Sequence, residues 1–74
     1  MNIGDIIFEQ GVYKIQFVEN ISEVMEPSPG HKGFKFCLLK DGTPYKYYSI
    51  ATGYPYNYGL MKSTVIGIFK NLMV

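Results

Sequence analysis

Side chains that can act as nucleophile and base are scarce in this chain, which has one cysteine and one histidine. A thiol and an imidazole form a catalytic pair when a third group orients the imidazole. His31 lies in a stretch rich in proline and glycine, and Cys37 follows on an expected strand. We interpret Cys37 as a small apolar strand residue and His31 as a solvated loop residue. No catalytic residue is predicted, and we expect a protein that is not an enzyme.

Metal and cofactor chemistry is not expected either. Zinc sites use closely spaced cysteines and histidines, calcium loops are rich in aspartate, and neither pattern occurs. Gly30-His31-Lys32-Gly33 matches the G-x-x-G loop with which KH domains clamp a nucleic-acid backbone. In that family the loop joins two helices, whereas here prolines precede it and a strand should follow, so we interpret it as a turn. The predicted cofactors and metals are none.

Tyrosine is the residue type that stands out. The chain has seven tyrosines, and six of them fall within residues 45–58. A core of this size cannot bury six phenols, because each buried hydroxyl needs a hydrogen-bond partner. On an extended strand Tyr45 and Tyr47 share one face, and Lys46 and Tyr48 share the other. We therefore expect one of these pairs in the core and the other exposed.

Three interpretations of the tyrosines stay open. They cap the open end of a small barrel, they form a protein-contact surface like those of antibody loops, or they stack the bases of a single-stranded nucleic acid. A net charge of +1 and the absence of arginine weigh against nucleic acid. The predicted partner-binding residues are Lys35, Lys46, Tyr48, Tyr54, Tyr56, Tyr58 and Lys62.

Charge is divided unevenly along the chain. Residues 1–31 carry five carboxylates against Lys14, and residues 32–74 carry six lysines against Asp41. Such asymmetry indicates a basic face where the two halves stay apart in space. We expect instead that strands from both halves interleave, which would remove most of the segregation.

The elements that position these residues are short strands joined by turns. Alternation predicts strands over 12–18, with Tyr13, Ile15 and Phe17 inward, and over 34–40, with Phe34, Phe36 and Leu38 inward. Asp41-Gly42 predicts a tight hairpin turn to a partner strand over 45–51. The remaining predictions are a strand over 3–8, a helix or bent strand over 20–25, loops over 26–33 and 52–61, and a strand over 64–69.

Residues 64–69 are open to a second interpretation. Thr64, Val65 and Ile66 favour a strand, whereas Val65, Ile68, Phe69 and Leu72 also fit a helical stripe. Gly67 would cost about 1 kcal/mol inside a helix, so we prefer the strand.

The predicted fold is one all-β domain over residues 1–74. Four or five strands would form a small barrel or rolled antiparallel sheet, SH3-like or OB-like, because closure removes exposed edges. The alternative is a β-sheet with one C-terminal helix. With 47% hydrophobic residues, the chain can build a core at this length.

Neither a signal peptide nor a membrane-length apolar run is visible, so we expect a cytoplasmic protein without membrane association. The apolar tail Leu72-Met73-Val74 leaves monomer and homodimer open. We predict a non-catalytic binding module that engages a larger protein partner, by analogy a small phage-type inhibitor or accessory protein. The alternative is a single-stranded nucleic-acid-binding protein that uses tyrosine stacking and lysine–phosphate contacts.

Overall fold

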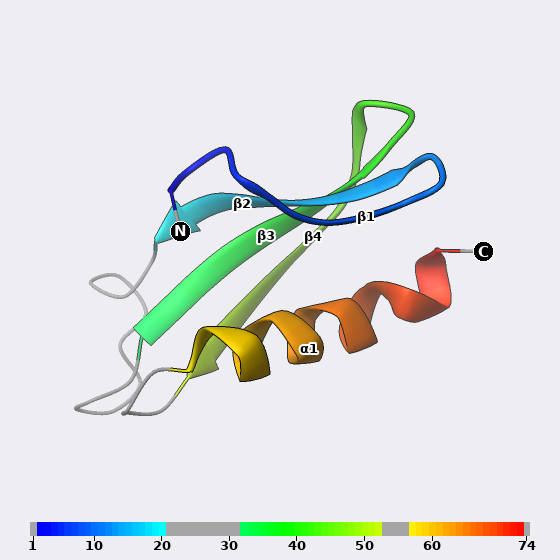
Figure 1. The fold of residues 1–74 in the computed structure, drawn as a ribbon. Coiled ribbons are helices and arrows are strands. Elements are labelled where there is room, and N and C mark those ends of the chain that lie inside the picture. Colours follow the sequence, from blue (N-terminus) through cyan, green and yellow to red (C-terminus); the bar gives the residue numbers. More distant parts are fainter. Residues whose placement is uncertain (1, 21–31, 53–56, 74) are drawn as a thin grey trace.

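The computed structural model describes residues 2–20, 32–52 and 57–73 (Figure 1). Four strands come first, and a helix with a short 3-10 turn follows them. The elements are β1 Ile6–Gln10, β2 Tyr13–Asn20, β3 Lys32–Lys40, β4 Thr43–Thr52, α1 Tyr58–Phe69 and η1 Lys70–Leu72.

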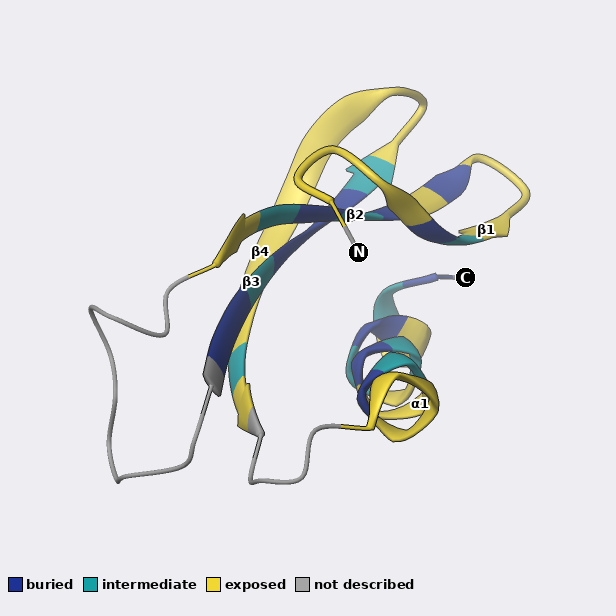
Figure 2. Ribbon diagram, turned by 60° about the vertical axis from the view of Figure 1, so that its left-hand side comes forward, coloured by how far each residue is buried: buried dark blue, intermediate teal, exposed yellow. Residues whose placement is uncertain are grey.

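The four strands form one antiparallel sheet in the order β1-β2-β3-β4. Within the described ranges β1 and β4 are its two edges and do not pair with each other, so the sheet is open. The predicted SH3-like or OB-like barrel is therefore wrong, and the alternative of a sheet with one C-terminal helix is confirmed. The sheet curls around α1, which lies against its concave face (Figure 2).

Register shifts mark an irregularity in each of the three strand pairs. They fall between Ile6 and Phe8, between Phe17 and Glu19, and between Leu38 and Leu39. A bulge bends its strand and increases the local twist. The sheet can thus wrap one helix without closing into a barrel.

The β3–β4 hairpin is confirmed where the sequence predicts it. Asp41 and Gly42 have φ angles of 54° and 78°, the positive values that a tight two-residue turn requires at both central positions. Strand β3 begins at Lys32, earlier than predicted, because Lys32 and Gly33 pair with Thr52 and Ala51 of β4. The predicted loop over 26–33 is wrong at that end. Its remainder up to position 31, and most of the ambiguous stretch over 20–25, lie outside the described residues.

The C-terminal element is a helix, so the strand predicted over 64–69 is wrong. The side chain of Asn57 caps α1 by accepting a hydrogen bond from the Leu60 N–H at 2.9 Å. Met61, Val65 and Phe69 recur every four residues and form its buried stripe. Gly67 lies on the exposed side, where a Cβ atom would meet nothing within 4 Å. Its propensity cost is therefore outweighed by burial of the stripe.

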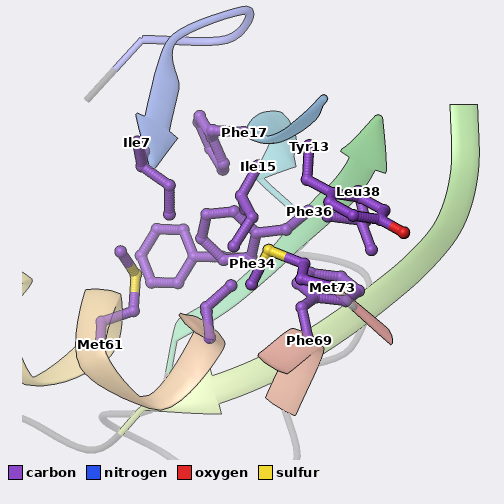
Figure 3. Close-up of a cluster of buried hydrophobic side chains, with 11 residues drawn as sticks. Ile7, Tyr13, Ile15, Phe17, Phe34, Phe36, Leu38, Met61, Phe69 and Met73 are labelled. Carbon is purple, nitrogen blue, oxygen red and sulfur yellow. The ribbon is translucent and has the colours of Figure 1, made fainter. Parts of the chain in front are cut away.

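The core lies between the concave face of the sheet and α1 (Figure 3). The inward alternation predicted for β2 and β3 is confirmed. The Phe17 ring packs on the rings of Phe34 and Phe36, with centroids 5.9 and 5.6 Å apart. The cluster consists of Ile7, Tyr13, Ile15, Phe17, Phe34, Phe36, Leu38, Met61, Val65, Phe69 and Met73.

The apolar tail packs onto this core. Met73 is only 7% exposed, and Leu72 is half-buried against the cluster. Met73 is thus covered within the chain and Leu72 is covered in part, so this much of the tail does not require a dimer contact. Val74 lies outside the described residues.

Candidate partner-binding surface

Strand β4 contributes no side chain to the buried cluster, although it is the longest strand in the described part of the chain. From Thr43 to Ala51 every residue is exposed except Ile50, which is half-buried and packs at the edge of the core. Figure 2 shows that β4 is exposed along most of its length, whereas its neighbour β3 is largely buried. The strand is therefore available to solvent along both faces and along its outer edge.

Three tyrosine rings of β4 lie in this exposed strand. Tyr45, Tyr47 and Tyr48 are 51%, 52% and 45% exposed. The sequence predicts that one of the two strand faces is buried, and this is wrong, because Lys46 on the helix side is exposed as well. We call the following residues the β4 surface: Lys35, Lys40, Tyr45, Lys46, Tyr47 and Tyr48.

The outer face of the sheet carries Tyr47. This residue lies opposite Cys37 in the register, and Lys35 lies opposite Ser49. Lys35 is thus the diagonal neighbour of Tyr47, within reach of a long side chain. Its Nζ atom lies 5.0 Å from the centroid of the Tyr47 ring, a cation–π contact.

The helix-side face carries Lys46 and Tyr48. Tyr48 lies opposite Phe36, and Lys46 lies opposite Leu38. The Tyr48 ring meets Phe69 of α1 edge to face, with centroids 6.4 Å apart and planes at 80°. Packing thus fixes the ring on one side while nearly half of the residue stays exposed.

The hairpin end of the surface is built around a bulge. Leu38 pairs with Lys46 and Leu39 pairs with Pro44, so Tyr45 is the extra residue in β4. The Lys40 Nζ atom lies 5.4 Å from the centroid of Tyr45 and 5.8 Å from that of Tyr13. Two of the three exposed β4 tyrosines, Tyr45 and Tyr47, therefore each lie against a lysine of β3.

Three of the seven predicted partner-binding residues lie on the β3–β4 hairpin, with Lys46 and Tyr48 on its helix-side face and Lys35 on the outer face. Tyr54 and Tyr56 lie outside the described residues. Tyr58 and Lys62 belong to α1, so the predicted loop over 52–61 ends before Tyr58.

Sequence reasoning missed three members of the β4 surface, Lys40, Tyr45 and Tyr47. The missing information was the position of β4 at the edge of the sheet. Edge position alone does not expose both faces, since the other edge strand, β1, buries Ile7; β4 in addition contributes no side chain to the buried cluster.

Charge follows the order of the strands within the sheet. The acidic side is formed by Asp5 just before β1, Glu9 in β1 and Glu19 in β2. The Glu9 carboxylate oxygen Oε1 lies 3.9 Å from Lys14 Nζ. The β3–β4 hairpin carries three lysines with described side chains and one aspartate, namely Lys35, Lys40, Lys46 and Asp41. The expected interleaving is wrong for the sheet, because strands of the two halves stay on opposite sides of it. The β4 edge is therefore basic.

The described residues bury no polar or charged side chain, and no three of their His, Cys, Asp and Glu residues gather as a metal-binding group. Cys37 is fully buried on the sheet face away from α1.

Among the helices that the structure describes, none has the length and apolar character to cross a membrane. Comparisons with known protein families, with curated proteins and with solved structures find no match.

Proposed function

We propose that this protein is a non-catalytic binding module that contacts a larger protein partner through the β4 surface. The observation that carries the proposal is the exposure of β4, a strand of 10 residues that presents three tyrosine rings and adds nothing to the buried cluster. Tyrosine supplies a large, rigid contact area at a low cost in side-chain entropy. The role of a small inhibitor or accessory protein fits the length of the chain.

The contacts within the surface support this role. Tyr48 rests on Phe69, which restrains its ring before any partner arrives, and Tyr47 has a weaker contact with Lys35. Side chains that are already ordered lose less entropy on binding. Tyrosine is one of the residue types enriched among those that dominate binding energy in protein interfaces.

A second candidate function is single-stranded nucleic-acid binding on the outer face of the sheet. The contact between Lys35 and Tyr47 favours it, since a base could stack near the ring while the ammonium group meets a phosphate. The chain has no arginine and a net charge of only +1, which makes this candidate the weaker one.

Photo-crosslinking tests the proposal directly. Benzoylphenylalanine replaces Tyr47 in one protein and Val12 in a control, because the two residues have matched exposures of 52% and 50% and Val12 lies in the β1–β2 turn. In an extract of the native host, position 47 should yield a discrete protein adduct that position 12 does not. Equal adducts from both positions, or none from position 47, would contradict the proposal. A nucleic-acid adduct at position 47 would support the second candidate instead.

A further inference from the structure

The outer edge of β4 is a row of backbone groups that no other strand in the described ranges pairs with. From Lys46 to Thr52 the register with β3 runs without a shift, so seven consecutive residues keep regular strand geometry. That length is enough for a typical strand. Beyond Lys46 the bulge at Tyr45 and the ring of Pro44 interrupt the edge, because proline has no N–H to donate.

The charges near the β4 edge affect which kind of strand can pair with it. Lys46 is exposed on the edge strand itself, and Lys35 and Lys40 lie on the neighbouring β3. Opposite charges on directly facing residues of adjacent strands attract, and like charges repel. A lysine on an edge strand also discourages unselective pairing. Lys46 is the lysine that would face an incoming strand directly, so a carboxylate opposite it is favoured over a lysine.

We propose that the partner of the β4 surface supplies an acidic, extended peptide segment that pairs with Lys46–Thr52 as a fifth strand of the sheet. This inference rests on the proposed function and adds the chemistry of the partner. Main-chain hydrogen bonds hold the incoming strand, and carboxylates on its helix-side face meet Lys46. Tyr48 on one face and Tyr47 on the other flank its side chains.

A second copy of this chain fits the edge less well. Parallel pairing of two β4 strands would set Lys46 against Lys46, and antiparallel pairing centred on Ser49 would set each Lys46 against Thr52, so neither arrangement offers Lys46 a carboxylate. The acidic strand β1 has only five residues, and its register shift leaves Phe8–Gln10 as the regular part. Three residues are fewer than the roughly five or six of a typical strand, so this edge offers fewer main-chain hydrogen bonds than Lys46–Thr52.

The test uses capped eight-residue peptides of alternating Thr and Glu, or Thr and Lys, with isotope-labelled protein. At about 1 mM, the weak end of specific affinity, the acidic peptide should shift the amide resonances of Lys46–Thr52. Exchange of the outward-facing amides in that segment should slow by about tenfold, because pairing protects them. The lysine peptide should change neither quantity.

Variants and modified peptides sharpen the test. Lys46→Glu should make the protein prefer the lysine peptide, whereas Lys70→Glu, the same charge change on an exposed residue of η1, should leave the preference unchanged. Methylating the backbone nitrogens of the Thr residues should affect peptide binding differently from methylating those of the Glu residues. Alternate residues of a strand point their N–H groups to opposite sides, so only one set faces β4. One of the two methylated peptides should bind as the parent does, and the other should not bind.

The inference is overturned by any of four results: no protection by the acidic peptide, equal effects of both peptides, equal effects of both methylation patterns, or concentration-dependent self-association that occupies the edge. A crosslinked protein partner at position 47 together with one of these results would leave the proposed function standing. Shifts of the same amides by an oligothymidine, with none by the acidic peptide, would overturn the inference in favour of nucleic acid.

Discussion

Phe36 and Tyr48 offer a paired test of whether β4 is a surface strand. The two aromatic residues face each other across β3 and β4 on the helix side of the sheet. Phe36 is fully buried, whereas Tyr48 is 45% exposed. We expect Phe36→Ala to lower the free energy of unfolding much more than Tyr48→Ala, although each variant removes one ring of similar size.

The magnitudes follow from what each ring contacts. Removing a buried phenylalanine costs about 3–5 kcal/mol through lost transfer energy and the cavity left behind. Tyr48→Ala loses about 1 kcal/mol for the covered half of the ring and about 0.5–1 kcal/mol for the edge-to-face contact with Phe69. A domain of 74 residues has a total stability of about 4–11 kcal/mol, so the first loss is a large fraction of the whole.

Urea unfolding followed by far-ultraviolet circular dichroism measures both losses. With a slope of about 1 kcal/mol per molar urea, Tyr48→Ala should lower the midpoint by about 2 M. If Phe36→Ala is unfolded without urea, both variants are compared in a buffer with added sucrose, which favours the compact state. Equal losses in the two variants would refute the reasoning, because Tyr48 would then be a core residue and β4 would not be a free surface.

Three further predictions concern α1 and the thiol. Asn57→Ala should lower the stability by about 1 kcal/mol and the melting temperature by about 4–8 °C, because the Leu60 N–H loses its acceptor. Asn57→Asp should keep the cap and the melting temperature, and equal losses would contradict the assignment. Gly67→Ala should stabilise the protein by about 1 kcal/mol, since the new methyl group meets no atom within 4 Å, whereas a thermal melt showing a loss would argue against a helix there. The Cys37 thiol should react with Ellman's reagent at least about a hundredfold more slowly in the folded protein than in urea, because it is fully buried. Equal rates in both states would contradict that burial.

The part of the fold that sequence predicts well is the part governed by local rules. Alternation predicts the inward faces of β2 and β3, and Asp41-Gly42 predicts the hairpin because its backbone accepts positive φ angles. These patterns act over two to eight neighbouring residues. They need no knowledge of how the strands are arranged in space.

The sequence favours a strand over the C-terminal helix because Gly67 counts against a helix. A propensity cost of about 1 kcal/mol is real, but burial of Met61, Val65 and Phe69 along one stripe contributes more. The stripe has value only if a sheet face lies opposite it. That information is tertiary and is not contained in residues 64–69 alone.

The candidate surface could be predicted only in part for the same reason. The cluster of tyrosines in the sequence indicates a contact surface, and Tyr48, Lys35 and Lys46 belong to it. The exposure of Tyr45 and Tyr47 depends on β4 being an edge strand beyond the cover of α1. Strand order is a property of the whole sheet, so a local sequence pattern does not predict it.

The simple order of the sheet has a kinetic consequence. Each ladder joins consecutive strands, and the widest gap between paired strands in the sequence is that from Asn20 to Lys32. Loop-closure entropy therefore stays small at every step, a condition that favours rapid folding. We expect the β3–β4 ladder, closed by two residues, to form first. Strand β4 would then assemble among the first parts of the molecule, even though its rings remain in water when folding is complete.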